Sequence, residues 1–184
     1  MLMKRISFDK QSILLKQNKR IFHTADLALL WGLENSKTTW VTVSRYIRKG
    51  TLYPIQKGLY STLPVSELDP YDLGSSVLHS YCYVSLETIL ARNGIISQTI
   101  IPITYVSSTS RRISLSGLIY QSRQMSDRFL FSDVDIQKVD RHLEASPERA
   151  VADMLYYEPS YHFDAENLIN WKRVRKIQEK VGYK

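Results

Sequence analysis

The chain has 184 residues, a formal net charge of +7 and one cysteine, Cys82. This length allows one medium domain or two small ones with a real hydrophobic core, and a single cysteine excludes an intrachain disulfide framework. No stretch approaches the roughly 18 apolar residues of a membrane span, and Asp9, Lys10 and Gln11 break the apolar run that a signal peptide would need. We therefore expect a soluble, cytoplasmic protein without membrane contact.

The positive charge is concentrated in the first third of the sequence. Residues 1–63 hold 11 Lys/Arg and 3 Asp/Glu, a net charge of +8, whereas residues 64–184 hold 14 and 15, a net charge of −1. Basic side chains that neutralise phosphates release counterions and supply most of the non-specific affinity for DNA. The charge distribution predicts a nucleic-acid contact within residues 1–63.

Residues 22–50 contain the start and stop signals of two helices. Thr24 is a predicted N-cap of the first helix, and Gly32 is a predicted left-handed stop. Asn35 or Ser36 can cap the second helix, which should run to about residue 49 and end at Gly50. A short helix, a turn and a longer basic helix are therefore expected in this order.

A hairpin is predicted directly after the second helix. Residues 52–55 and 59–62 read as short strands, with Pro54 on an edge strand. Gly58 supplies the positive φ that the tight turn between them needs. Two helices followed by a hairpin give the order of a winged helix-turn-helix, which lays its second helix in a DNA groove.

The second helix separates into two faces at about 100° per residue. Trp40, Val43 and Ile47 form the face expected to enter the core. The opposite face carries hydroxyls and cations suited to base edges and phosphates. The predicted DNA-binding residues, including the cation at the hairpin turn, are Lys37, Thr38, Thr42, Arg45, Arg48, Lys49 and Lys57. A solvated basic face that binds nothing is the alternative.

The rest of the chain predicts a second, small mixed α/β domain at residues 71–184, after a loop-like joint between Pro64 and Pro70. Ser85 is a predicted cap of its second helix, Ser146-Pro147 a strong helix start, and Asp164 the predicted cap of the last helix. The expected helices are 72–81 and 86–92, one from Pro147 and one from Asp164, and strands are expected within 95–106, 113–121 and 128–132. The predicted fold class is thus α+β: a winged helix-turn-helix domain at residues 1–63 followed by this domain.

The last helix has an apolar face and a basic face. Trp171, Val174, Ile177 and Val181 recur at spacings of three and four, and residues 171–184 hold six basic side chains against Glu179. A docked C-terminal helix with a solvated face is expected. A second contact with the DNA backbone and a dimer contact are the open alternatives.

Catalytic constellations are absent from the sequence. The four histidines share no metal-site spacing, and none pairs with Cys82 or an acidic cluster, so we expect structural histidines. Cys82 lies between two tyrosines and is expected to be a small buried residue rather than a nucleophile. We accordingly predict no catalytic residues, no metal site and no cofactor, and do not expect an enzyme.

Three stretches together resemble one known family. RKGTLYPIQKGLYS (48–61) resembles its helix end and wing, with Gly50, Gly58 and Tyr60 in matching places. YVSLETILARNGII (83–96) resembles the opening of the second domain, and ASPERAVADMLYY (145–157) a later helix of that domain. The chain resembles the AbiEi family of transcriptional regulators, the antitoxins of type IV toxin–antitoxin systems of the abortive-infection type.

This resemblance implies a repressor that binds double-stranded DNA at the operator of its own operon, and a C-terminal domain that opposes a nucleotidyltransferase-like toxin without requiring direct contact. A homodimer on the DNA is compatible with both roles. Three alternatives stay open: a stand-alone winged-helix regulator, a protein-interaction module without a toxin partner, and an enzyme whose site lies in the second domain.

Overall fold

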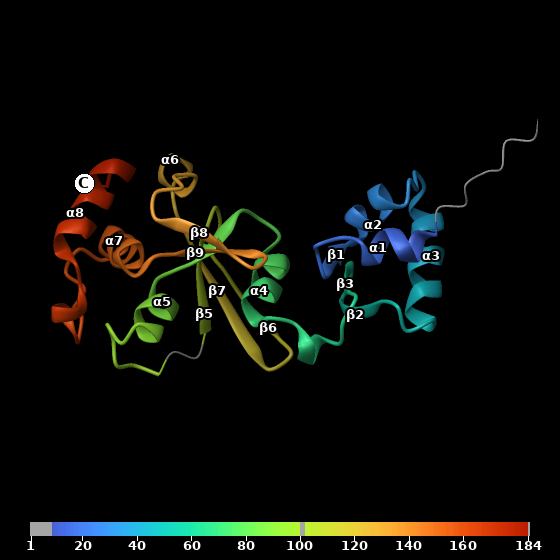
Figure 1. Cartoon of the computed structure of the whole chain (residues 1–184), viewed down its shortest axis with the longest axis horizontal. Helices are drawn as coiled ribbons and strands as arrows, with labels where there is room; N and C mark the ends of the chain where they lie inside the picture. Colours follow the sequence, from blue (N-terminus) through green and yellow to red (C-terminus); the bar gives the residue numbers. More distant parts are fainter. Residues whose placement is uncertain (1–8, 100–101, 184) are drawn as a thin grey trace, which may run out of the picture. The chain divides into compact units, whose positions relative to one another are not determined.

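The computed structural model describes residues 9–99 and 102–183 and divides the chain into two compact units, Met1–Asp69 and Pro70–Lys184 (Figure 1). The division falls at the end of the predicted joint between Pro64 and Pro70. The basic start at Lys4 and Arg5, the middle of the expected strand region 95–106 and the C-terminal Lys184 lie outside the described residues. The predicted α+β class is confirmed, because both units combine helices with a sheet.

The first unit contains three α-helices, one 3₁₀ helix and a three-stranded sheet among its described residues. Its sheet has the order β1-β3-β2, and both strand pairs are antiparallel. The strand before the first predicted helix was not expected from the sequence. In chain order the elements are α1 (Lys10–Leu15), β1 (Ile21–His23), α2 (Thr24–Leu30), α3 (Ser36–Arg48), β2 (Tyr53–Gln56), β3 (Leu59–Ser61) and the 3₁₀ helix Val65–Glu67.

Local hydrogen bonds explain where the helices of the first unit begin. Asn35 caps α3 as predicted, because its side-chain Oδ1 accepts a hydrogen bond from the backbone N–H of Lys37 at 2.8 Å. The predicted cap of α2 is one residue off, since His23 occupies that position. Thr24 instead contacts the hairpin: its N–H donates to the carbonyl of Gly58 at 2.9 Å. The start of α2 is thereby tied to the β2–β3 turn.

The core of the first unit is built around two aromatic rings. Trp31 stacks on Tyr46 of α3 with ring centroids 5.1 Å apart, and its indole N–H donates to the carbonyl of Lys10 at 3.1 Å. Phe22 of β1 and Tyr60 of β3 lie opposite each other in the sheet and are buried in the same cluster. The other buried members are Leu14, Leu27, Val43 and Leu52.

The second unit has a six-stranded mixed sheet of order β6-β7-β5-β4-β9-β8. The pairs β5–β7 and β4–β9 are parallel, and the other pairs are antiparallel. Its elements in chain order are α4 (Pro70–Leu78), β4 (Cys82–Val84), α5 (Glu87–Arg92), β5 (Pro102–Ser107), β6 (Arg111–Leu115), β7 (Leu118–Gln124), α6 (Asp127–Leu130), β8 (Ile136–Val139), β9 (His142–Ala145), α7 (Pro147–Tyr157), the 3₁₀ helix Glu166–Leu168 and α8 (Trp171–Val181).

Alternation along β5 shows that α4 and α5 cover opposite faces of this sheet. The hydroxyl of Thr104 accepts a hydrogen bond from the backbone N–H of Thr88 on α5 at 3.0 Å. The next residue, Tyr105, donates its hydroxyl to the carbonyl of Tyr71 on α4 at 3.0 Å. Successive side chains of a strand point to opposite faces. Gly74 lets α4 approach this close, because a Cβ there would collide with the Tyr105 ring and its hydroxyl.

Several predicted elements of the second unit are wrong in type or extent. The expected strand at 128–132 is not formed: residues 128–130 belong to the helix α6, in which the Leu130 N–H donates to the Ser126 carbonyl at 3.0 Å, and residues 131–132 follow it. The expected strand 113–121 is instead the β6–β7 hairpin, which turns at Ser116 and Gly117, both with positive φ. Strands β4, β8 and β9 were missed because each is only three or four residues long.

Two predicted caps in this unit are also wrong, and one is right. Ser85 does not cap α5, since Leu86 holds that position and the Ser85 hydroxyl donates to Asp153 instead. Asn170, not Asp164, caps the last helix, so α8 starts at Trp171. Ser146 caps α7 as predicted and accepts a hydrogen bond from the N–H of Arg149 at 3.1 Å.

The last helix docks through its apolar face, as the sequence predicted. Val174, Ile177 and Val181 are buried, Trp171 is half-buried, and α8 packs against α7. Its cations face solvent, and one of them, Arg173, also pairs with Asp135. Among the described residues, the helices are too short and too polar to cross a lipid bilayer.

Candidate nucleic-acid interface

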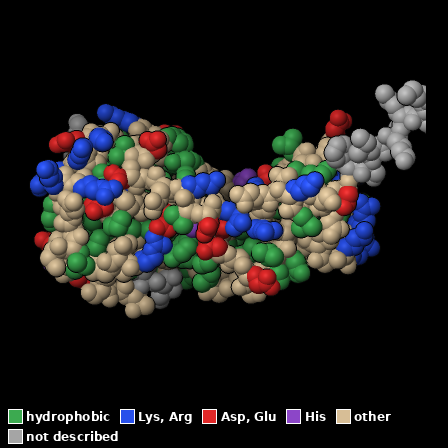
Figure 2. Space-filling view, in the orientation of Figure 1, with side chains coloured by type: hydrophobic (Ala, Val, Ile, Leu, Met, Phe, Trp, Pro, Cys, Tyr) green, Lys and Arg blue, Asp and Glu red, His purple; other side chains and the backbone are tan. Residues whose placement is uncertain are grey.

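Helix α3 and the β2–β3 turn bring the predicted DNA-binding cations to the surface of the first unit. Lys37, Arg45, Arg48 and Lys49 are exposed along α3 and at its end, and Lys57 is exposed at the turn between β2 and β3. In Figure 2, Lys and Arg side chains gather over the edge of the first unit where Figure 1 places α3. Thr38 is also exposed at the start of the helix. Six of the seven predicted residues therefore reach solvent.

Thr42 does not reach solvent, and the prediction that it lies on the groove-facing side of α3 is wrong. Only 7% of the residue is exposed. Its hydroxyl donates to the carbonyl of Thr38 at 2.8 Å, one turn earlier in the helix. A threonine bonded in this way satisfies its own hydroxyl, so its methyl group can face the core. We remove Thr42 from the candidate interface.

The prediction for Trp40 is wrong in the opposite sense, because this residue is exposed rather than buried. The sequence assigned it to the core, but 67% of its surface is exposed. The buried stripe of α3 is instead Thr39, Thr42, Val43 and Tyr46, with Ile47 packed at its edge. The ring that α3 contributes to the core is Tyr46, which stacks on Trp31, whereas Trp40 stays outside.

The exposed part of α3 thus has a defined composition. We call the exposed residues from Lys37 to the end of α3, together with Lys49 directly after it, the α3 surface: Lys37, Thr38, Trp40, Val41, Arg45, Arg48 and Lys49. The sequence missed Val41 and misplaced Trp40. The available signal was the spacing of Thr39, Val43 and Tyr46, which marks a buried stripe whose first member is polar.

Among the described residues, the cations of the α3 surface have no carboxylate within 4 Å. Within the described residues, the ion pair of the first unit with a distance below 4 Å is Lys19–Asp26, which lies outside α3. Arg45 and Lys49 lie over the ring of Tyr46, with their charged ends 5.6 and 5.9 Å from its centre. Aromatic packing orients these two side chains but leaves their charges available to an anion.

The β2–β3 turn has a fixed backbone. Gly58 has φ of 81°, the left-handed conformation predicted from the sequence. The Gly58 carbonyl accepts hydrogen bonds from the N–H and the hydroxyl of Thr24, at 2.9 and 3.3 Å. Lys57 is therefore presented from a turn that is anchored to α2, rather than from a free loop.

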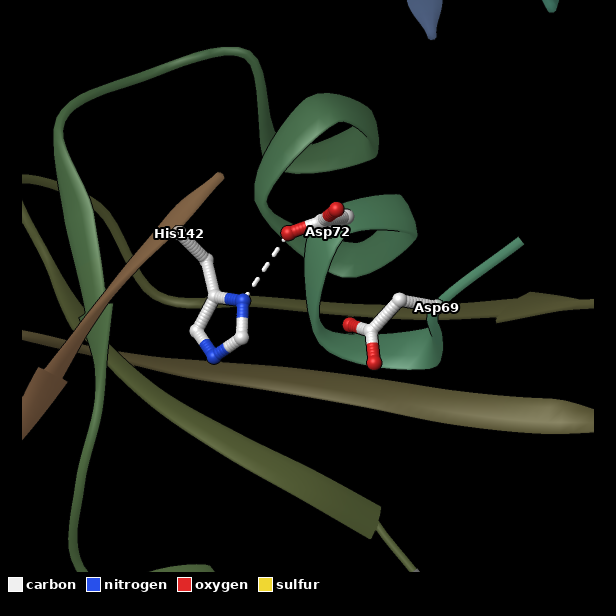
Figure 3. A group of neighbouring side chains, drawn as sticks. All are labelled: Asp69, Asp72 and His142. Atoms are coloured by element: carbon white, nitrogen blue, oxygen red, sulfur yellow. Dashed lines mark hydrogen bonds and ion pairs between the residues drawn. The ribbon is translucent and has the colours of Figure 1, made fainter. Parts of the chain in front are cut away.

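The second unit holds a polar cluster that the sequence missed. His142 on β9 is buried, and its Nδ1 lies 2.9 Å from Oδ1 of Asp72 on α4, while its Nε2 lies 3.4 Å from Oε2 of Glu144. Figure 3 shows the bond between His142 and Asp72, with Asp69 in the chain just before α4. The expectation that no histidine pairs with acidic residues is wrong, because the chain brings β9 beside α4 from 70 residues away.

Neighbouring arginines give this cluster the character of an ion-pair network. Arg141 lies 3.8 Å from Asp72, and Arg92 donates two hydrogen bonds to Glu144. Carboxylates and imidazole are metal-ligand types, but here Asp72 and Glu144 each contact an arginine and the imidazole of His142. The contacts connect α4, α5 and β9, which fits a structural role.

A second buried network joins α7 to α8 and the sheet. Arg149 donates through Nε to Asp153 at 2.7 Å and through its other nitrogens to Tyr83, Tyr183 and two backbone carbonyls. Asp153 also accepts the hydroxyls of Ser85 at 2.8 Å and Tyr183 at 2.6 Å. Burial raises the pKa of the Tyr83 hydroxyl well above its usual value, so it stays a protonated partner.

Cys82 and one cavity are the features of this unit to consider for an enzyme site. Cys82 is buried as predicted, and burial raises the pKa of its thiol to about 11, which disfavours the nucleophilic thiolate. A cavity of about 310 Å³ is lined by Glu87, Gln98, Thr99, Pro102, Thr104, Arg112 and Gln121. Glu87 is paired with Arg123, and the Thr104 hydroxyl donates to the Ser85 carbonyl at 2.7 Å. These groups hold α5 and the sheet together.

Comparison with known proteins adds a likeness of fold. In sequence, the chain matches no family model and no curated protein. In structure, it is similar to the RV2827C protein from Mycobacterium tuberculosis, with a TM-score of 0.54, 92% of this chain and 69% of that chain covered, and 14% sequence identity. At this identity the likeness concerns the fold alone.

Proposed function

We propose that the chain is a DNA-binding transcriptional repressor of its own operon, with a winged helix-turn-helix in residues 1–63 whose α3 lies in the major groove. The observation that carries the proposal is the α3 surface. Lys37, Arg45, Arg48 and Lys49 follow one helix face and, among the described residues, have no carboxylate within 4 Å. The anchored turn that presents Lys57 follows directly in the chain. An α-helix of this kind fits the major groove, with a hairpin beside it on the backbone.

The proposal includes an antitoxin role for residues 71–184, which rests on the resemblance of residues 83–96 and 145–157 to the AbiEi family. In that reading the second unit opposes a nucleotidyltransferase-like toxin, and the first unit represses transcription. The second unit is nearly neutral, with 14 Lys/Arg against 13 Asp/Glu, which suits a role that does not depend on nucleic acid.

The test is the salt dependence of binding by the full chain to DNA from immediately upstream of its coding sequence. If Lys37, Arg45, Arg48, Lys49 and Lys57 each meet a phosphate, the logarithm of the binding constant should fall with log salt at a slope of about −4.5. A shallower slope is expected if one of them reads a base edge instead.

A matched control separates the α3 surface from basic character in general. Arg175 and Lys176 are exposed on α8, so their joint replacement by alanine removes two charges from another helix. That variant should keep the wild-type slope, whereas Arg45→Ala with Lys49→Ala should make the slope shallower. Equal slopes in the two variants, or no binding even at low salt, would contradict the proposal.

A further inference from the structure

The α3 surface carries two large apolar side chains among its cations. Trp40 is 67% exposed and Val41 is 66% exposed. Both lie in the first half of α3, whereas Arg45, Arg48 and Lys49 lie in the second half and just beyond it. In helix-turn-helix proteins the N-terminal part of the recognition helix meets the base edges.

Helical spacing aligns each apolar residue with cations. Residues four apart lie on the same side of a helix, one turn above each other. Trp40 is therefore in line with Ser44 and Arg48, and Val41 is in line with Lys37 and Arg45. A ligand that covers this surface must offer apolar groups flanked by negative charge.

The floor of the DNA major groove has this character. Phosphates line both edges of the groove, and the C5-methyl group of thymine is its one apolar feature. A neutral apolar protein surface would leave the charges of Arg45 and Arg48 unpaired on binding, which is unfavourable. Charge complementarity therefore favours DNA over a protein partner as the occupant.

We propose that Trp40 and Val41 contact thymine C5-methyl groups in the major groove and so make the operator preference depend on thymine at those positions. The inference rests on the proposed DNA-binding function. It adds a specificity determinant that reads methyl groups by apolar contact, beside the cations that meet phosphates and guanine.

The experiment compares two versions of the upstream DNA fragment, one with thymine and one with deoxyuracil in its place. Deoxyuracil keeps Watson–Crick pairing but lacks the C5-methyl group. For each thymine methyl that the protein touches, the full-length chain should bind the uracil fragment about fourfold more weakly, the change expected for one buried methyl group. Both fragments are measured at the same salt concentration.

Variants then assign the effect to the two side chains. Trp40→Ala and Val41→Ala should each bind thymine DNA more weakly and show a smaller difference between thymine and uracil DNA than the wild type. Arg48→Ala is the matched control on the same surface. It should weaken binding to both fragments by the same factor and keep the wild-type difference.

The outcomes distinguish failure of the thymine-methyl contact from failure of the proposed DNA-binding function. Absence of wild-type binding to either fragment at low salt overturns the proposed function. Tight but equal wild-type binding to both fragments overturns the methyl contact and leaves the function in place. The methyl contact is likewise overturned if Trp40→Ala and Val41→Ala are folded and discriminate as the wild type does, or if they instead abolish self-association of the protein.

Discussion

The two units use their charged residues in different ways. The first unit, residues 1–69, holds 11 Lys/Arg against 5 Asp/Glu, and the cations of its α3 surface have no carboxylate within ion-pair distance among the described residues. The second unit holds 14 against 13, and several of its arginines pair with carboxylates of the same unit, from the fully buried Arg149 to the half-exposed Arg173; the others are Arg92, Arg123 and Arg141. Charges paired internally stabilise a structure, whereas unpaired charges on one helix face are available to an external anion.

The largest expected effect concerns the buried pair of the second unit. Asp153→Ala should lower the free energy of unfolding of this unit by about 3–5 kcal/mol, because it leaves the Arg149 guanidinium buried without its carboxylate. Denaturant unfolding measures the loss. Arg173→Ala, which breaks the half-exposed pair with Asp135, should cost under about 1 kcal/mol. Similar losses in the two variants would remove the distinction between buried and exposed pairs.

The second prediction divides the proposed functions between the units. Arg45→Ala with Lys49→Ala should abolish repression and weaken operator binding by more than the roughly 1–3 kcal/mol of one base contact. Both side chains are exposed, so the fold should be retained. Protection against the partner toxin, expressed from an independent promoter, should be unchanged. If a folded double variant fails to protect cells, neutralisation works through DNA binding, and the second unit has another role.

Arg45 alone tests base reading. Arg45→Ala should weaken operator binding by about 1–3 kcal/mol and relax the preference at one base position if its guanidinium pairs with guanine. Competition by operators that differ at single positions measures this preference. Unchanged affinity and unchanged selectivity would show that a different face of α3 meets the DNA.

Lys57 tests the contact made by the β2–β3 turn, with a smaller effect. Lys57→Ala should weaken binding to all sequences alike and make the salt slope shallower by about one, as expected when a single phosphate is no longer neutralised. Titrations at several salt concentrations on specific and random DNA measure both quantities. A weakening confined to the operator would mean that Lys57 reads sequence.

The smallest expected effect is on folding, at Trp40. Trp40→Ala should change the free energy of unfolding of the first unit by no more than about 0.5 kcal/mol, because the side chain is already mostly in water. Trp31→Ala is the matched comparison and should cost about 3–5 kcal/mol, since Trp31 is buried and stacked on Tyr46. A large loss at Trp40 would restore the core position that the sequence predicts for it.

Much of the local structure was predictable because its causes are local. Asn35 and Ser146 cap the helices they precede, Pro147 opens α7, and Gly58 adopts the left-handed turn. In each case the residue's own side chain or backbone freedom determines the conformation within a few positions. The candidate DNA-binding cations were predictable for the same reason, since the net charge of a segment and the position of a helix can be inferred without the tertiary structure.

The orientation of α3 was not predictable from its own residues. Trp40 is the largest apolar residue of the helix, yet Thr39 and Thr42 occupy the buried stripe in its place. The buried stripe packs against residues from outside the helix, among them Trp31, which stacks on Tyr46. Packing in a small core is decided by volume and fit as well as by hydrophobicity, so the residue with the greatest hydrophobicity can be excluded.

The sequence by itself determined the α+β class and the basic first third of the chain. It also determined the helix and turn signals that place cations on α3 and Lys57 at the β2–β3 turn. The tertiary structure decided which side of α3 is buried, the pairing of β4 with β9, and the meeting of His142 with Asp72 and of Arg149 with Tyr83. The physical reason is range. Caps and turns depend on interactions within a few residues, whereas the buried side of α3 depends on packing against residues outside the helix. The other contacts join segments more than 50 residues apart, whose proximity depends on the packing of the whole unit.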